Sequence, residues 1–331
     1  MPYARIAAVG SALPERLVPN AEFEELVDTS DDWIVSRTGI RARHFVGEGE
    51  TASSLAAQAA RNALDAAGID PSAIDLTIVA TVSGDQPLPS TASFVQDHLG
   101  LSGGAFDLAA ACAGFIYGTE LAAAQIEAGR AETVLVCGTE VLSRFVNFRD
   151  RTTCVLFGDG AGAAVLTPGD EPGLIGSILQ NDGSHARILE VPAGGSAEPV
   201  TEETIREARD KIRMPDGREV FKRAVVGMSD AAAALLDKKG FSADDVDLLV
   251  PHQANVRIIK SVAQRLQFPM EKVFVDLEEV GNTSAASVPI ALDHAWRSGR
   301  LQPGNLVLTA AFGAGLAWGA NLLRWTAEAP R

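Results

Sequence analysis

The hydrophobic pattern of the chain alternates between short, continuous apolar runs and longer alanine-rich segments. The runs at residues 133–138 (TVLVCG) and 305–313 (NLVLTAAFG) have the length of strands, and a helix-length segment ending in Gly-Arg precedes each. Strands that are apolar throughout are typical of a buried, mostly parallel sheet that helices cover on both faces. The pattern therefore predicts an α/β fold with helices packed on a mostly parallel sheet.

Parts of this pattern occur twice. Residues 64–79 (LDAAGIDPSAIDLTIV) match residues 236–251 (LDKKGFSADDVDLLVP), and each segment predicts a helix, a glycine stop, a short loop and a strand. Residues 106–114 (FDLAAACAG) match residues 275–283 (VDLEEVGNT) in the same order. Two matched pairs in one order predict an internal duplication of a strand–helix–strand plan, related by a pseudo-twofold axis.

The duplication divides the chain into an N-terminal half, residues 1–170, and a C-terminal half, residues 171–331. Residues 191–221 interrupt the plan with a Gly/Pro-rich stretch, a charged helix-like stretch and a further loop. Such an insert is typical of either a solvated excursion or an active-site flap. The sequence does not decide its role.

The composition is that of an ordinary globular protein, with 47% hydrophobic and 21% charged residues in a chain of 331. No apolar run approaches the ~20 residues that a membrane span needs, and the N-terminus lacks the layout of a signal peptide. The three cysteines have no metal-type spacing and fit a reducing compartment. We therefore expect a cytoplasmic protein without disulfides, metal or membrane contacts. The net charge of −15 also argues against general nucleic-acid binding.

Three chemically able side chains follow predicted strands of the two halves. Cys112 follows the strand at residues 105–108 and opens a helix, and His252 directly follows the strand at residues 247–250. Asn282 lies one position past the residue that the repeat aligns with Cys112. Ligands bind beyond the carboxyl ends of strands in open sheets, so the repeat can bring all three to one pocket. Taken singly, each could instead be structural: a small core residue, a satisfied core histidine and a turn cap.

Together these side chains suit one kind of reaction. A cysteine at a helix N-terminus has its thiolate stabilised by the helix dipole and free amides, so Cys112 is expected to be a nucleophile near neutral pH. A neutral histidine and an asparagine amide can both donate hydrogen bonds to a carbonyl oxygen, as an enolate-forming step requires. Cys137 and Cys154 are expected to be structural.

Five motifs resemble 3-oxoacyl-[acyl-carrier-protein] synthase III, the condensing enzyme that starts bacterial type II fatty acid synthesis. In chain order they are DTSDDWIVSRTGIRARH, DLAAACAGF, PHQANVRII, GNTSAASVP and AAFGAGLAWGA, and the resemblance covers residues 3–326. It implies an acyltransferase with a thiolase-like fold of five layers (αβαβα), assembled as a homodimer. It implies no cofactor, because acyl-CoA is a substrate.

The resemblance also implies a ping-pong reaction. Cys112 would accept the acyl group of an acyl-CoA, and malonyl-acyl carrier protein would then lose CO2. His252 and Asn282 would stabilise the resulting enolate, which attacks the acyl-cysteine to give a 3-oxoacyl-acyl carrier protein. Elongating synthases carry a second histidine, and biosynthetic thiolases a second cysteine, where this chain has Asn282. The oxyanion hole would use the backbone N–H groups of Cys112 and Ala314, which replaces the middle glycine of a Gly-Gly-Gly-type turn.

The same resemblance assigns a CoA site. Trp33 would stack on the adenine, Arg37 and Arg151 would bind the nucleotide end, and Asn255 would lie beside the pantetheine. Considered without the resemblance, Trp33 could equally be an ordinary core aromatic, and the two arginines could equally be solvated surface residues. In this family the loop at residues 82–94 shapes the acyl pocket from the partner subunit, with Leu88 where some members carry Phe or Thr.

A basic helix face is predicted over residues 256–267 (VRIIKSVAQRLQ). At about 100° per residue, its polar and basic side chains share one face and its aliphatic side chains the other. A basic face on so acidic a protein suits an acidic carrier protein, and a merely solvated helix face is the alternative. The expected docking residues are Lys222, Arg257, Lys260 and Arg265.

Two alternative functions deserve comparison. A thiol hydrolase uses the same Cys–His–Asn order, but it requires an aromatic flank around an early cysteine and has no internal repeat. The closer alternative is a synthase III-like enzyme of a polyketide or other secondary-metabolite pathway, which primes a polyketide or transfers an acyl group to another acceptor. The sequence does not specify the acyl starter.

Overall fold

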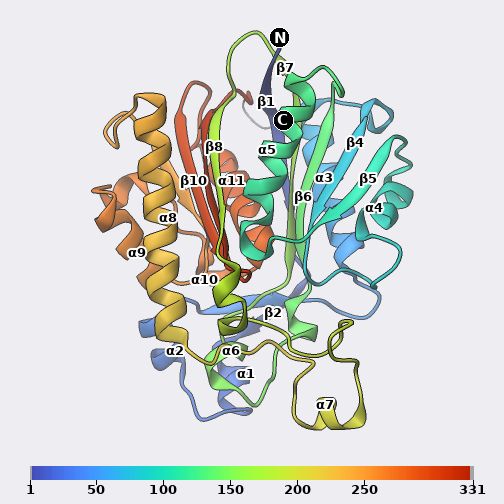
Figure 1. The fold of residues 1–331 in the computed structure, drawn as a ribbon, viewed down its shortest axis with the longest axis vertical. Helices are drawn as coiled ribbons and strands as arrows, with labels where there is room; N and C mark the ends of the chain where they lie inside the picture. Colours follow the sequence, from blue (N-terminus) through green and yellow to red (C-terminus); the bar gives the residue numbers. More distant parts are fainter. Residues whose placement is uncertain (1, 329–331) are drawn as a thin grey trace.

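Two β-sheets with matching strand orders form the centre of the molecule (Figure 1). The computed structural model describes residues 2–328. The first sheet has the order β1-β7-β6-β4-β5 and the second has the order β8-β11-β10-β9. A parallel bridge between Leu249 and Val273 lies beside β9, as β5 lies beside β4 in the first sheet. The predicted duplication is therefore confirmed in the strand order.

The sheets consist of β1 (Tyr3–Ala12), β4 (Leu76–Ala80), β5 (Gly104–Leu108), β6 (Val134–Glu140), β7 (Gly160–Gly169), β8 (Leu174–Asn181), β9 (Leu248–Pro251), β10 (Leu306–Gly313) and β11 (Ala317–Arg324), with β2 (Arg16–Pro19) and β3 (Ala42–Phe45) forming a small separate sheet. The helices are α1 (Asn20–Glu24), α2 (Asp31–Thr38), α3 (Ala52–Ala67), α4 (Thr91–Leu99), α5 (Gly114–Glu127), α6 (Arg151–Cys154), α7 (Glu202–Arg206), α8 (Gly217–Lys239), α9 (Val256–Arg265), α10 (Leu277–Val280) and α11 (Ser287–Arg297).

Strand directions differ from the prediction. β4 is parallel to both β5 and β6, and β9 is parallel to β10. β7 is antiparallel to β1 and β6, and β11 is antiparallel to β8 and β10. The prediction of a mostly parallel sheet is therefore wrong. Helices cover both faces of the sheet centres, so central strands such as β6 and β10 are buried along their whole length whatever their direction, and the hydrophobic pattern cannot reveal that direction.

The helices form three layers around the two sheets. α3 and α4 cover the outer face of the first sheet, and α8 and α9 cover that of the second. α5 and α11 lie between the sheets and contact strands of both (Figure 1). This order confirms the five-layered αβαβα fold. The boundary near residue 170 stays a prediction, and the chain passes from the first sheet to the second between Gly169 and Leu174.

The inner helices begin in the same way. Each follows a 3₁₀ turn, η2 (Ala111–Ala113) before α5 and η6 (Ser284–Ala286) before α11, and the two turns pack on each other. The first residue of each turn has a positive φ, 44° at Ala111 and 48° at Ser284. The duplication therefore extends to the local backbone of these turns.

Two glycines at strand ends allow the turns to dock. A Cβ on Gly138 of β6 would lie 2.3 Å from the carbonyl oxygen of Ala285 in η6. A Cβ on Gly313 of β10 would lie 2.5 Å from the amide nitrogen of Cys112 in η2. No side chain fits at such distances. Each sheet thus supports the turn that belongs to the other half.

The smaller elements gather at one end of the molecule. The β2–β3 sheet, α1, α2, α6 and α7 lie at the lower end in Figure 1, below the two large sheets. The insert at residues 191–221 contains α7 and ends inside α8. Val191 and Ile212 line the cavity at Cys112, so the insert contributes to this cavity, as an active-site flap would. Within residues 2–328, no helix is long and apolar enough to cross a membrane.

Candidate active site

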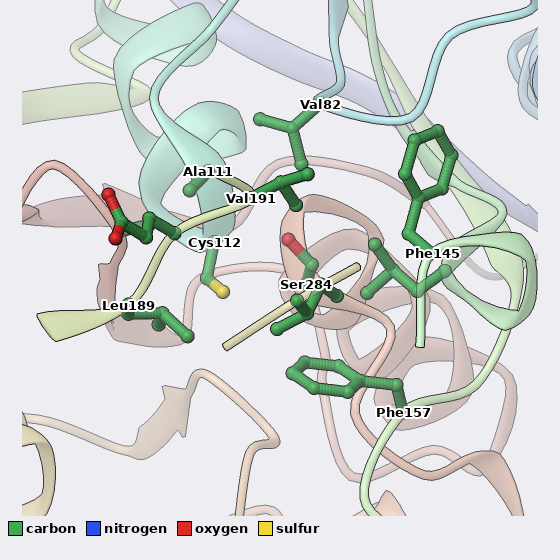
Figure 2. Close-up of a pocket in the computed structure, with 12 residues that line it drawn as sticks. Val82, Ala111, Cys112, Phe145, Phe157, Leu189, Val191 and Ser284 are labelled. Carbon is green, nitrogen blue, oxygen red and sulfur yellow. The ribbon is translucent and has the colours of Figure 1, made fainter. Parts of the chain in front are cut away.

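The candidate nucleophile lies on η2, immediately ahead of α5. Cys112 is 8% exposed, and it lines a cavity together with Ser284 and Phe157 (Figure 2). Ala314 follows Gly313, which contacts the Cys112 amide, and lines the same cavity. Ala314 is not among the described residues with a positive φ, so alanine is tolerated there. The structure therefore brings the two predicted oxyanion-hole residues together.

His252 directly follows β9, and burial makes it a neutral hydrogen-bond donor. Its backbone N–H donates to the carbonyl of Ala310, and its Nδ1 lies 2.6 Å from Ser287 Oγ. That hydroxyl also accepts from the amide of Gln253. With the proton of Ser287 directed at Nδ1, the other ring nitrogen, Nε2, carries the proton of the neutral imidazole and is the donor. Burial lowers the pKa of His252 to about 4. The imidazole is therefore uncharged at neutral pH.

Asn282 is fixed by its own loop. Its Oδ1 accepts a hydrogen bond of 2.9 Å from the amide of Ser284, which leaves the two Nδ2 protons free to donate. Its backbone N–H donates to the carbonyl of Leu156, and its backbone carbonyl accepts from the amide of Gly158. The amide group of Asn282 is thus oriented before any ligand binds.

One cavity of about 140 Å³ is lined by Cys112, His252, Asn282 and Asn255. The prediction that strand ends of the two halves converge is therefore confirmed. A second cavity of about 260 Å³ shares Cys112 and Phe157 with the first. Its lining is mainly apolar and includes Val82, Leu142, Phe145, Leu189 and Ile212. Cys112 therefore lies where a polar site meets an apolar pocket.

The electrostatics of Cys112 differ from the prediction. The pKa of this thiol is raised to about 12, mainly by burial and in part by the charge of Glu140. The interaction with Ser284 and the cysteine's own backbone amide act in the opposite direction. The expected thiolate near neutral pH is therefore wrong for the resting site, because a charge in this buried position is costly. The thiol must lose its proton during the reaction.

The predicted alignment of Asn282 also needs correction. The turns η2 and η6 pair Ala111 with Ser284 and therefore Cys112 with Ala285. Asn282 lies three positions before Ala285, not one position past the counterpart of Cys112. The shift arises because α10 occupies the second half at this point and has no counterpart before η2. The match between residues 106–114 and 275–283 rests on a shared Asp-Leu pair before this point, so it cannot detect an insertion that follows the pair.

Comparisons with known proteins identify the family. Models described as 3-oxoacyl-[acyl-carrier-protein (ACP)] synthase III and its C-terminal region match residues 106–183 and 236–325. The beta-ketoacyl-[acyl-carrier-protein] synthase III of Roseiflexus sp. (strain RS-1) is 48% identical and covers 98% of this chain and 99% of its own. The enzyme of that name from Novosphingobium aromaticivorans is 49% identical, and the match covers 96% of this chain and 98% of that enzyme. The chain belongs to the 3-oxoacyl-[acyl-carrier-protein] synthase III family.

Solved structures agree with this membership. The synthase III of Aquifex aeolicus VF5 superposes with a TM-score of 0.89 at 43% identity, over 97% of this chain and 100% of that chain. The priming beta-ketosynthase of the R1128 polyketide pathway superposes with a TM-score of 0.90 at 37% identity, over 99% of this chain and 97% of that chain. The expected class, a condensing acyltransferase with a thiolase-like fold, is confirmed. Among residues 2–328, no group of three or more His, Cys, Asp or Glu is placed to hold a metal ion.

The residues that the synthase III resemblance assigns to CoA fall in two places. The guanidinium carbons of Arg37 and Arg151 lie 4.7 and 4.8 Å from the centre of the Trp33 ring. Arg151 also donates to the backbone carbonyl of Asp28. Asn255 lies apart from this cluster, on the cavity wall, where its side chain caps α9. Their roles in CoA binding stay predictions.

Leu88 does not line the cavity of its own chain. It is 83% exposed, whereas Val82 at the start of the same loop lines the apolar pocket. Such exposure of a leucine is what a contact with a partner subunit would remove. The expected homodimer and the role of Leu88 stay predictions.

The expected docking residues lie on two packed helices. Lys222 on α8 is 73% exposed, and the neighbouring Phe221 lies under the guanidinium of Arg257, 5.9 Å away. Lys260 is also exposed on α9. Arg265 pairs with Asp230 at 2.9 Å, and Lys222 pairs more distantly with Glu219 at 3.9 Å, so part of the charge of each is neutralised. The basic face is therefore strongest around Arg257.

Sequence reasoning missed the side chains that support the nucleophile and the histidine. Ser287 holds His252, and Ser284 lies between Cys112 and Glu140. Both serines follow Asn282 within one motif, and Glu140 ends an apolar run at the same carboxyl edge as Cys112. A charged residue at the end of a buried strand was the available signal for Glu140.

Proposed function

We propose that the protein catalyses the decarboxylating Claisen condensation of an acyl-CoA with malonyl-acyl carrier protein, which initiates type II fatty acid synthesis. One observation carries the proposal: Cys112, His252 and Asn282, contributed by both halves, line one cavity and leave an N–H donor of each of the last two unpaired. The mainly apolar pocket beside Cys112 provides room for the acyl chain.

In the first half-reaction, Cys112 attacks the thioester carbonyl of the acyl-CoA. The carbonyl oxygen gains negative charge, and the backbone N–H groups of Cys112 and Ala314 donate hydrogen bonds to it. The tetrahedral intermediate collapses, the bond to the sulfur of CoA breaks, and the acyl group stays on Cys112. The CoA sulfur leaves with a proton.

In the second half-reaction, malonyl-acyl carrier protein occupies the polar cavity. The Nε2–H of His252 and the Nδ2–H of Asn282 donate to its thioester oxygen, where the enolate charge develops as CO2 leaves. A neutral imidazole suits this role, because it donates without having to gain a proton first. The carbanion then attacks the acyl-cysteine, and Cys112 leaves as a thiolate that takes up a proton.

The remaining assignments follow the same proposal. The Trp33 cluster with Arg37 and Arg151 binds the nucleotide of CoA, and Asn255 contacts the pantetheine. The basic face of α8 and α9 docks the acidic carrier protein, and a second copy of the chain places its Leu88 loop at the acyl pocket. Priming of a polyketide is the second candidate function, favoured by the structural likeness to the R1128 priming beta-ketosynthase.

The test of this proposal is the mass of the intact protein after incubation with a panel of acyl-CoAs. The wild type should gain one acyl group, and Cys112→Ser should gain none, because an alcohol is a far weaker nucleophile than a thiolate. Cys154→Ala, which removes a cysteine of α6 instead, should still gain one. An adduct that persists in Cys112→Ser would refute the assignment of the nucleophile.

A further inference from the structure

Glu140 is a buried carboxylate to which the proposed reaction gives no role. It is the last residue of β6, and it is 0% exposed. Its Oε2 accepts hydrogen bonds from the hydroxyls of Ser83 and Thr81 and from the amide of Val82. Its Oε1 accepts a hydrogen bond of 3.0 Å from the hydroxyl of Ser284. Both carboxylate oxygens thus have hydrogen-bond partners, and one of these partners, Ser284, lines the cavity at Cys112.

Ser284 joins this carboxylate to the nucleophile. Its side chain lines the cavity beside Cys112 (Figure 2), and its interaction with the cysteine thiol lowers the pKa of that thiol. Because the hydroxyl donates its proton to Glu140, its lone pairs can accept the S–H proton of Cys112. Ser284 donates to Glu140, and Cys112 lies beside Ser284 in the same cavity, so the three groups can form a path for the thiol proton.

The charges favour proton movement along this path. If the Cys112 proton left for water, a thiolate and an ionised Glu140 would remain together in a buried site, which is costly. If the proton moves to Glu140 instead, the site keeps a single negative charge. Burial raises the pKa of Glu140 to about 7, so this carboxylate can both take and release a proton near neutral pH. Its other partners, on the loop after β4 and on η6, are hydroxyl and amide groups.

We propose that Glu140, acting through Ser284, holds the thiol proton of Cys112 during acyl transfer and returns it to the departing sulfur of CoA. The S–H proton moves to Ser284 as the hydroxyl proton of Ser284 moves to Glu140. The new carbon–sulfur bond forms to Cys112 and the bond to CoA breaks. The CoA thiolate then receives a proton from Ser284, which is replenished from Glu140, so the carboxylate ends ionised. Glu140 is a positioning residue in this scheme, which rests on the proposed acylation of Cys112.

His252 is the other basic group near Cys112, and it is poorly suited to this task. Its Nδ1 is occupied by Ser287, and its Nε2 carries the proton that the enolate step needs. Its pKa of about 4 makes it a weak base. Glu140 and His252 therefore serve different half-reactions.

The test compares two reactions of Cys112 in the full-length protein as a function of pH. One is acylation by acyl-CoA, and the other is alkylation by iodoacetamide, which needs a thiolate but has no thiolate leaving group to protonate. Both are followed by the mass of the intact protein. The variants are Glu140→Gln and Ser284→Ala, each checked for folding by its melting temperature.

For Glu140→Gln, the two reactions should change in opposite directions. Acylation at neutral pH should fall by about 10²-fold, the usual contribution of a positioned proton-transfer group. Alkylation should become faster above about pH 8, by about tenfold, because the like charge that raises the pKa of Cys112 is gone. Ser284→Ala should slow acylation similarly without accelerating alkylation, because it breaks the path and keeps the charge.

A matched variant tests the same path without interrupting it. Ser83→Ala removes a hydrogen bond that lowers the pKa of Glu140. Wild-type acylation should rise through about pH 7 and then level off, because only ionised Glu140 accepts the proton, and Ser83→Ala should move this rise to higher pH. A merely structural role would lower the rate by one factor at every pH.

Three results would overturn the proposal. Parallel losses of acylation and alkylation in Glu140→Gln would mean that the carboxylate only supports the fold. Parallel gains would mean that it only repels the thiolate. An unshifted profile in Ser83→Ala would mean that Glu140 does not set the pH dependence. If the wild type is alkylated but not acylated by any acyl-CoA, it is the proposed function that fails.

Discussion

The turns that precede α5 and α11 share their backbone geometry but carry different side chains. In the first half, η2 holds Cys112, the proposed nucleophile, and in the second half the matching position of η6 is Ala285. The second half instead places polar groups around its turn, namely Asn282 before it and Ser287 after it. On one shared framework, the first half thus carries the proposed nucleophile and the second half the proposed hydrogen-bond donors.

A neighbouring pair of positions shows the same contrast. In the first half, Ala80 at the end of β4 faces Gly114, where a Cβ would lie only 2.8 Å from that of Ala80. The corresponding positions of the second half are His252 and Ser287, which are hydrogen-bonded at 2.6 Å. Small residues bring the first turn close to its sheet, whereas the second half uses the extra room for a polar pair. The comparison predicts that the two halves can be disabled separately.

The largest effect is expected from His252→Ala and Asn282→Ala. Release of labelled CO2 from malonyl-acyl carrier protein should fall by about 10²-fold or more, the usual cost of losing one donor to a developing oxyanion. Acylation of Cys112 should persist in both variants, because neither side chain contributes to the first half-reaction. Variants that lost acylation and still released CO2 would invert the proposed division between the halves.

A second prediction concerns stability, because His252 and Glu140 have opposite linkage to pH. The folded-state pKa of His252 is lowered from 6.5 to about 4, so the unfolded state binds more protons between these values and stability falls as pH falls. The pKa of Glu140 is raised from 4.5 to about 7, so the folded state binds more protons there and stability falls as pH rises. The two contributions partly cancel in the wild type.

Single variants should separate these contributions. In His252→Gln, the free energy of unfolding should fall more steeply as pH rises from about 4.5 to about 7, by up to about 3 kcal/mol relative to the wild type. In Glu140→Gln, the free energy of unfolding should instead rise relative to the wild type over the same pH range, by a similar amount. Urea unfolding at a series of pH values measures both. Identical slopes in the three proteins would contradict the burial of these charges.

The smallest effect is expected on the docking face, which belongs to the second half. Arg257→Glu should raise the KM for malonyl-acyl carrier protein several-fold and reduce its salt dependence, because rim charges act mainly on encounter. Arg265→Glu is the matched variant and should have less effect, since Asp230 already neutralises Arg265. Acylation by acyl-CoA, and use of malonyl-CoA as a surrogate acceptor, should barely change. Equal losses with both acceptors would mean that α9 only supports the active site.

The sequence predicted the positions of Cys112 and His252 because each follows an apolar run that could be read directly, whereas Asn282 was placed by a repeat alignment that the structure corrects. The strands ending before Cys112 and His252 have the predicted bounds to within one residue. Strand direction could not be predicted, because burial on both faces removes the alternation of apolar and polar residues that distinguishes antiparallel from parallel strands. The thiol pKa was predicted from the helix N-terminus alone, whereas burial and the charge of Glu140 outweigh that effect.

The supporting network was beyond sequence reasoning for a different reason. Ser284 and Glu140 come from different halves, and only the docking of η6 on β6 brings them to 3.0 Å. Serines in a motif rich in small residues give no individual signal, and their partners are set by tertiary packing. The acyl pocket has the same origin, since Phe157 and Ile212 meet Cys112 from separate segments.

The close approaches at Gly138 and Gly313 also bear on how the protein comes into being during translation. β10 is made almost at the end of the chain, yet it is the strand against which the Cys112 amide rests. The first half therefore leaves the ribosome before His252 and Ala314, the proposed oxyanion-hole residue, have been made. Cys112 acquires its surroundings only when the last strands dock, so we expect an incomplete chain to lack the proposed activity.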